Sequence, residues 1–266
     1  MVNPQSGTDN MGKKKYRIIS TILLVAILFL PLSVAVATEI TVAAANSTCG
    51  VLKKAGEIFS RQEGVTIHYI CKSSGVLAKG LQSGYITADY YISASQKWMD
   101  YLSAARLIDP KMVKPLWDNR IVAAVAKKSG LELHNWDELA TAKVTTVLVG
   151  DPSTTPNGRQ FKNAMVSRGL WQGVRGKIVA KRHMALIGDA LMSANDTTIG
   201  IMFPTSLGNQ LKSILGMPTE WHDPIRYYAA PLLGSKKKQE IASYGTFLRS
   251  EEVNKLFRQK GYIILP

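Results

Sequence analysis

Three short segments of this sequence carry small and hydroxylated residues at points where a strand pattern gives way to a helix pattern. They are Asn46-Ser47-Thr48, Lys72-Ser73-Ser74-Gly75, and the stretch from Gly150-Asp151-Pro152 to Pro156-Asn157-Gly158. A helix N-terminus has unpaired backbone N–H groups and a partial positive charge, so hydroxyls there can surround an oxyanion without a counter-charge. The alternative for each segment is ordinary helix capping by Ser, Thr and Asn.

The elements expected around these segments alternate between strands and helices. Expected strands cover residues 40–44, 66–70, 88–93, 121–126, 144–149, 178–180, 198–203 and 225–233. Expected helices cover residues 51–59, 76–81, 98–105, 136–140, 161–165, 185–192, 239–249 and 251–260. This alternation favours an α/β fold in which helices connect parallel strands. Open sheets of this kind bind ligands beyond the carboxyl ends of their strands, where all three polar segments fall.

The charge of the chain favours an anionic partner. The formal net charge is +14, of which the first 37 residues contribute four basic side chains against Asp9, so the remainder carries +11. A nucleic-acid-binding protein would gather this charge in a patch with interleaved aromatic residues. Here the basic residues are scattered, with one tight row at residues 236–238. We therefore expect no nucleic-acid partner, and a solvated basic surface is the simpler interpretation of the charge.

The N-terminal segment has the layout of a signal peptide. A basic stretch at residues 13–17 precedes an apolar run at residues 18–30, and Ala35-Val36-Ala37 supplies a small-x-small cleavage pattern. We expect residues 1–37 to be removed and the protein to be periplasmic or otherwise extracytoplasmic. The alternative is an uncleaved membrane anchor, because the apolar stretch approaches the length of a short span. Residues 1–10 are interpreted as an upstream extension, with Met11 as an alternative start.

Cys49 and Cys71 are the two cysteines of the chain. In an oxidising compartment an even pair can close a disulfide, and free thiols remain the alternative. Neither C-x-x-C nor H-E-x-x-H spacing occurs, so zinc is not expected. A soft-metal site formed with His68 is opposed by strand alternation, which places His68 and Cys71 on opposite faces. We therefore expect no metal other than one carried within an oxyanion.

The most informative motif is the continuous segment from Ala88 to Asp100, A-D-Y-Y-I-S-A-S-Q-K-W-M-D. It resembles the signature A-D-x-F-I-S-A-D-Q-K-W-M-D of periplasmic molybdate-binding proteins. Other segments are similar to that family in order and spacing: residues 40–45, Ser73-Ser74-Gly75, Gly150-Asp151-Pro152, Pro156-x-Gly158, Gly200-Ile201 and Gly261-Tyr262. The resemblance covers residues 39–263.

This resemblance implies a type II periplasmic binding protein, in which two crossing strands join two α/β lobes and the ligand cleft lies between them. Lobe 1 would contain residues 38–118 and 227–266, and lobe 2 residues 119–226. The implied function is capture of a tetrahedral oxyanion, molybdate or tungstate, for an ABC importer, with the permease in the cytoplasmic membrane as partner. We expect a monomer without a cofactor.

The resemblance also implies which residues hold the anion. In the family two serines bind it through hydroxyl and backbone N–H groups, together with N–H groups of the second lobe and a tyrosine hydroxyl. By motif the serines fall on Ser47 and Ser74, and the second-lobe N–H groups on Asn157 and Ala185. The tyrosine position reads Phe203, so one hydrogen bond is missing. Such a loss costs on the order of 1.5–3 kcal/mol of binding free energy unless another donor replaces it.

Neighbouring side chains are further candidates for contact with the anion. Asn46 and Ser73 adjoin the two serines. Arg182 and His183 precede the second-lobe turn and would bring a positive charge, although a solvated surface run is the simpler interpretation. The side chain of Asn157 either adds an amide donor or caps a helix.

Phe203 keeps a second class of function open. A binding-protein fold with an altered site would serve as an interaction protein, anchored to the membrane by its N-terminal segment, or would bind a different ligand. An enzyme is not expected, because the chain lacks G-x-S-x-G, a phosphate-loop lysine motif and a paired Cys–His signature. The four histidines are dispersed along the chain: His68, His134, His183 and His222.

Overall fold

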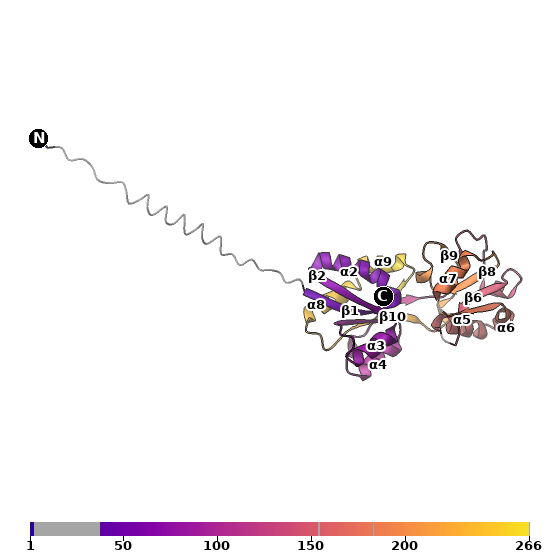
Figure 1. Cartoon of the computed structure of the whole chain (residues 1–266), viewed down its shortest axis with the longest axis horizontal. Coiled ribbons are helices and arrows are strands. Elements are labelled where there is room, and N and C mark those ends of the chain that lie inside the picture. Colours follow the sequence, from indigo (N-terminus) through magenta and orange to yellow (C-terminus); the bar gives the residue numbers. More distant parts are fainter. Residues whose placement is uncertain (3–37, 154, 183, 266) are drawn as a thin grey trace. The chain divides into compact units, whose positions relative to one another are not determined.

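The computed structural model describes residues 1–2, 38–153, 155–182 and 184–265. From Thr38 onwards the chain contains two α/β lobes, each built on its own sheet (Figure 1). Apart from its first two residues, the predicted signal peptide lies outside the described residues. Among the helices that the structure describes, none has the length and apolar character needed to cross a membrane.

Lobe 1 contains a six-stranded sheet in the order β11-β4-β10-β3-β1-β2. Its strands are β1 (Thr38–Ala45), β2 (Val65–Lys72), β3 (Tyr90–Ser93), β4 (Lys114–Asn119), β10 (Ile225–Pro231) and β11 (Ile263–Ile264). Its helices are α2 (Cys49–Glu63), α3 (Ser74–Gln82), α4 (Gln96–Ala104), α8 (Lys238–Phe247) and α9 (Glu251–Gln259), with short 3-10 turns η1 (Asn46–Thr48) and η2 (Pro110–Met112).

Helices cover both faces of the lobe 1 sheet. Figure 1 shows α2 and α9 on one side of the sheet and α3 and α4 on the other. Val42 packs into the core on the α2 side, whereas the next residue, Ala43, packs into the core on the α3 side. A strand buried on both faces needs apolar residues at successive positions, which explains the apolar run at residues 42–45 of β1.

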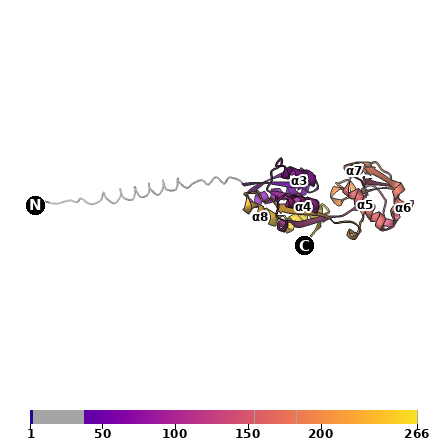
Figure 2. The same cartoon turned by 90° about the horizontal axis from the view of Figure 1, so that it is seen from below.

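Lobe 2 contains a five-stranded sheet in the order β7-β6-β8-β5-β9. Its strands are β5 (Val122–Ala126), β6 (Thr146–Gly150), β7 (Ile178–Lys181), β8 (Thr198–Met202) and β9 (Leu211–Gly216). Its helices are α5 (Pro156–Ser167), α6 (Trp171–Val174) and α7 (Met184–Met192), seen around the second lobe in Figure 2, with 3-10 turns η3 (Trp136–Ala140), η4 (Arg175–Lys177), η5 (Pro204–Ser206) and η6 (Thr219–Trp221).

Both sheets combine parallel and antiparallel strand pairs. β1 pairs in parallel with β2 and β3, and β6 pairs in parallel with β7 and β8, as the alternation predicted. The strands next to the two crossings, β4, β5, β9 and β10, pair antiparallel. β4 runs directly into β5 in the other sheet, so no crossover helix is available there to set a parallel direction.

Several elements differ from the sequence-based expectation. β4, β9 and β11 were not predicted, and residues 136–140 form a 3-10 turn where a helix was expected. β4 extends to Asn119, one residue into the predicted second lobe, and β10 begins at Ile225, two residues before the predicted return to lobe 1. Helix α2 ends at Gly64 as predicted, with a left-handed φ of 68°.

A carboxylate that is 9% exposed joins β1 to the segment after β10. Asp89 accepts hydrogen bonds from the backbone N–H of Thr41 (2.8 Å), the hydroxyl of Ser235 (2.7 Å) and the ammonium of Lys237 (3.1 Å). Burial raises the pKa of Asp89, but these hydrogen bonds and the Lys237 charge outweigh burial, so the pKa is lowered from its ordinary value. The charged form of Asp89 therefore stabilises the fold.

We expect Asp89→Asn to lower the free energy of unfolding by about 1.5–3 kcal/mol at pH 7, because hydrogen bonds to a charged acceptor are lost. Since the folded-state pKa lies below the unfolded value of about 3.9, this stabilisation is complete above that value and is lost as pH falls through the folded pKa. Urea unfolding measures the difference in free energy of unfolding between the wild-type protein and Asp89→Asn. It is measured at pH 7 and at the lowest pH where both proteins fold. The exposed Asp196→Asn is the control; a difference that does not depend on pH contradicts the prediction.

Helix α5 approaches the end of β6 backbone to backbone. A Cβ at Gly158 would collide with the carbonyl oxygen of Gly150. Thr155 caps the helix by accepting a hydrogen bond from the Gly158 N–H at 3.3 Å. The glycine therefore allows the first turn of α5 to sit directly on the carboxyl end of β6, which fixes the position of Asn157.

Gly158→Ala is expected to destabilise the protein by about 1–3 kcal/mol, because the added methyl group has to displace backbone. Gly50 provides the matched control: it lies in α2, and a Cβ there meets nothing within 4 Å. Gly50→Ala should be neutral or stabilise by up to about 1 kcal/mol. Thermal or urea unfolding compares the two variants, and similar stabilities would argue against the close contact between α5 and β6.

Candidate functional site

The two predicted serines lie on neighbouring loops at one edge of the lobe 1 sheet. β1 and β2 pair in parallel, with Ala45 opposite Lys72. Ser47 and Ser74 each follow two residues later, so both loops leave the carboxyl edge of the sheet. Helices α2 and α3 begin at these loops. The structure therefore brings together the two residues on which the sequence interpretation depended.

The candidate neighbours of the serines share these loops. Asn46 and Ser73 are both exposed. Ser73 is the N-cap residue of α3, yet its side chain makes no capping hydrogen bond. Ordinary capping therefore does not account for the hydroxyl of Ser73.

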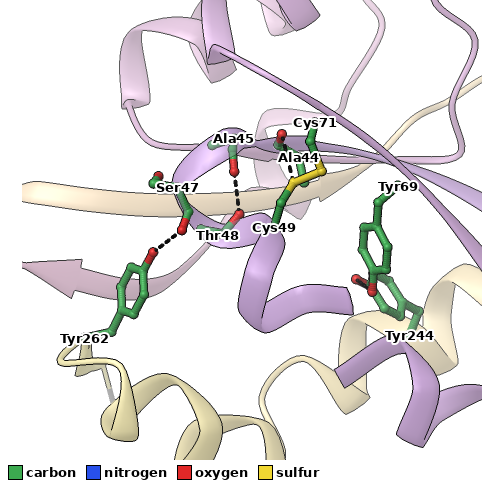
Figure 3. Close-up of a disulfide and its surroundings, with 9 residues drawn as sticks. All are labelled: Ala44, Ala45, Ser47, Thr48, Cys49, Tyr69, Cys71, Tyr244 and Tyr262. Atoms are coloured by element: carbon green, nitrogen blue, oxygen red, sulfur yellow. Dashed lines mark hydrogen bonds between the residues drawn. A yellow bond between two sulfur atoms is a disulfide. The ribbon is translucent and has the colours of Figure 1, made fainter. Parts of the chain in front are cut away.

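A disulfide holds the Ser47 loop to the second strand. Cys49, the first residue of α2, is bonded to Cys71 near the end of β2, with a Cα–Cα distance of 6.2 Å (Figure 3). Thr48 also donates its hydroxyl to the carbonyl of Ala45 at 2.7 Å. The Nε2 of His68 lies 3.3 Å from a carboxylate oxygen of Glu39, and the described part of the chain contains no group of three His, Cys, Asp or Glu residues able to hold a metal.

Buried tyrosines hold the backbone carbonyls of both serines. Tyr262 donates to the carbonyl of Ser47 at 2.8 Å (Figure 3), and Tyr91 donates to the carbonyl of Ser74 at 2.9 Å. Burial raises the pKa of Tyr91 to about 12, although its hydrogen bonds lower it, and burial likewise raises the pKa of Tyr262. Both phenols therefore stay protonated near neutral pH and remain donors.

The serine hydroxyls also have partners. The backbone N–H of Ala94 donates to Ser74 Oγ at 3.0 Å, and Ser47 Oγ lies 3.1 Å from the hydroxyl oxygen of Tyr227. Since a backbone N–H only donates, Ser74 keeps its own proton for another acceptor. The sequence interpretation did not identify Ala94, Tyr91 or Tyr227. Two of them lie within the Ala88–Asp100 motif, which was the available signal.

The structure corrects one of the two roles offered for the side chain of Asn157, that of a helix cap. This residue is 3% exposed, and its Nδ2 donates to the carbonyl of Ile201 at 3.3 Å. The cap of α5 is Thr155. The amide therefore does not cap the helix, and it joins α5 to β8. The backbone N–H of Asn157, in the first turn of α5, has no hydrogen bond to any described residue and stays available to an anion.

The remaining second-lobe candidates do not line one common cavity. Ala185 is exposed and lines a cavity of about 510 Å³ between α7 and residues 206–211, whereas Phe203 lines a different cavity. Arg182 is exposed, and His183 lies outside the described residues. The structure thus places Ala185 and Phe203 at different openings.

Phe203 directly follows β8 and is half-buried. It lines a cavity of about 390 Å³, together with the loop of residues 94–96 from lobe 1 and with Arg159 and Arg226. Arg226 forms a two-point ion pair with Asp118, at 2.7 and 2.8 Å. Arg159 is exposed, and no ion pair joins it to a described residue. The sequence pattern could not show that these arginines, rather than Arg182, lie beside Phe203.

Comparisons with known proteins agree with this architecture. The family model described as bacterial extracellular solute-binding protein matches residues 40–263. The chain is 28% identical over 237 residues to the molybdate-binding protein ModA of Escherichia coli, covering 85% of this chain and 89% of that protein. It is 27% identical over 257 residues to ModA of Haemophilus influenzae, covering 94% and 98%. The solved periplasmic molybdate-binding protein of Azotobacter vinelandii has the same fold, with a TM-score of 0.67 at 17% identity, covering 85% of this chain and 99% of that chain. With two lobes, two crossing strands and a family match over nearly all of residues 38–266, this chain belongs to the bacterial extracellular solute-binding proteins.

Proposed function

We propose that this protein captures a tetrahedral oxyanion, molybdate or tungstate, outside the cytoplasm and delivers it to the permease of an ABC importer. The pair of loops bearing Ser47 and Ser74 is the observation that carries the proposal. Both loops leave the same edge of one sheet, and a helix begins at each. The relatives named for molybdate binding support this choice of ligand.

Neutral donors suffice for this task. Hydroxyl and backbone N–H groups that are fixed before binding replace the hydration shell of the anion, and their hydrogen bonds to a charged acceptor are stronger than neutral ones. Ser74 supplies an O–H whose oxygen is already occupied by Ala94, and Asn157 supplies a backbone N–H at a helix N-terminus. A site lined by donors disfavours hydrogen phosphate, because that anion has to donate a proton of its own.

The proposal includes no chemical step and no cofactor. The protein would act as a monomer that binds, closes and releases its anion at the permease. Solute-binding relatives of the same family support an extracytoplasmic location. Because Phe203 replaces the expected tyrosine, the competing function is an interaction protein that has lost its anion, and a ligand panel separates the two.

Thermal shifts of residues 38–266 with molybdate, tungstate, sulfate, phosphate and vanadate test the proposal. Molybdate or tungstate should raise the melting temperature, because a ligand that binds only the folded state stabilises it. Ser47→Ala and Ser74→Ala should each weaken binding by about tenfold to a hundredfold, since a hydrogen bond to a charged acceptor is lost.

Ser243→Ala, on α8, is the matched control and should bind like the wild-type protein. A wild-type protein that responds to none of the five anions supports the interaction protein instead. Equal effects of the Ser47, Ser74 and Ser243 substitutions would place the anion elsewhere.

Phe203→Tyr tests the missing donor separately. If the ring faces the bound anion, the restored hydroxyl adds one charge-assisted hydrogen bond and should tighten molybdate binding about tenfold. Isothermal titration calorimetry measures the affinity, and the melting temperature without ligand checks that the fold is retained. An unchanged affinity would mean that Phe203 does not face the anion.

A further inference from the structure

A buried tyrosine of the returning strand contacts the hydroxyl of Ser47. Tyr227 lies on β10, is 2% exposed, and places its hydroxyl oxygen 3.1 Å from Ser47 Oγ. The ring of Tyr262 packs edge-on against it, with ring centroids 5.3 Å apart. The proton of Tyr262 is already given to the carbonyl of Ser47 at 2.8 Å. The contact between Tyr227 and Ser47 therefore involves the hydroxyl of the serine and not its carbonyl.

The two serines have matching surroundings. The oxygen of Ser74 receives a hydrogen bond from the Ala94 N–H, a group that can only donate. At Ser47 the equivalent partner is Tyr227, whose hydroxyl can donate or accept. Each serine carbonyl is meanwhile held by another tyrosine, Tyr91 or Tyr262. At both loops the structure fixes the serine through its backbone and supplies a separate partner for its side chain.

An anion at the serine loops settles the direction of the Tyr227 hydrogen bond. An oxyanion without protons only accepts, so Ser47 has to give it the single proton of its hydroxyl. Ser47 then has no proton left for Tyr227, and Tyr227 becomes the donor across the 3.1 Å contact. Because Tyr227 is buried, water does not replace it in this role.

Resting on the proposed oxyanion function, we infer that Tyr227 is a positioning residue that donates to Ser47 Oγ and directs the Ser47 proton towards the bound anion. Hydrogen bonds in such a chain polarise one another, so the Ser47 hydroxyl becomes a stronger donor. The same orientation presents a proton to an incoming P–OH group, which needs an acceptor instead. Tyr227 thus favours fully deprotonated anions over hydrogen phosphate.

Strand pairing positions the backbone of Tyr227, and its buried ring packs against Tyr262. Tyr227 pairs with Trp117 of β4, so both crossing strands position it. Trp117 stacks on Phe257 of α9, with ring centroids 3.6 Å apart. A donor held in this way loses little conformational entropy when the anion binds. The hydrogen bond from Tyr227 to Ser47 can therefore contribute to the affinity for the anion.

The test is a double-mutant cycle measured by isothermal titration calorimetry with molybdate and with phosphate. It compares the wild-type protein, Tyr227→Phe, Ser47→Ala and the double variant. Tyr227→Phe should weaken molybdate binding about threefold to tenfold, the range expected for one hydrogen bond, and should narrow the preference for molybdate over phosphate. In the Ser47→Ala background the same substitution should have no further effect.

Tyr244→Phe is the matched control, because Tyr244 makes a similar buried contact with the hydroxyl of Tyr69 at 3.1 Å, away from the serine loops (Figure 3). It should leave both affinities unchanged. Melting curves without ligand identify a temperature at which every variant is folded, and the titrations are carried out at that temperature.

The outcomes separate this inference from the proposed function. A wild-type protein that binds neither molybdate nor tungstate overturns the proposed function and the inference with it. If the wild-type protein and the Tyr227→Phe variant bind molybdate equally tightly, the inference about Tyr227 is wrong, whereas the proposed function stands. Equal weakening by Tyr227→Phe in the wild-type and Ser47→Ala backgrounds means that Tyr227 is only structural, which also overturns it.

Discussion

The parallel pairing of β1 with β2 is the constraint on which the proposed anion site depends. Because Ala45 lies opposite Lys72, the two loops that follow leave the same edge of the sheet within one strand spacing of each other. The Cys49–Cys71 disulfide joins the first residue of α2, two residues after Ser47, to the end of β2. A shift in this register would separate Ser47 from Ser74. The two serines could then no longer contact the same anion.

The groups proposed to hold the anion at the two serine loops are uncharged hydroxyls and backbone N–H groups. Buried phenols hold the loop carbonyls, and their raised pKa values keep them as neutral donors. Neutral dipoles can be buried without a counter-charge. An unpaired cation buried in the empty site would instead cost folding free energy before the anion binds. The excess positive charge of the chain is then free to attract anions at long range.

Much of the lobe 1 half-site was predictable from the sequence, because local patterns determine it. Strand and helix periodicity placed Ser47 and Ser74 at strand ends, and Gly64 marked the end of α2. The short edge strand β11 and the antiparallel strands at the crossings carry no such pattern, since distant residues define their pairing. The second lobe shows the same limit: Thr155, not Asn157, caps α5, and Arg159, not Arg182, lies beside Phe203. Tertiary packing decides which side of a helix meets a cavity. The contact of Tyr227 with Ser47 also depends on tertiary packing, so the sequence pattern did not reveal it.

The central claim is that uncharged groups at the ends of β1 and β2 hold the oxyanion. Anomalous diffraction from crystals grown with molybdate or tungstate tests it most directly, because the heavy atom marks its own position. The account predicts one strong site whose oxygens lie about 2.5–3.0 Å from the hydroxyl oxygens of Ser47 and Ser74. A heavy atom bound instead by Arg159 and Arg226, or only on the basic surface, would contradict it.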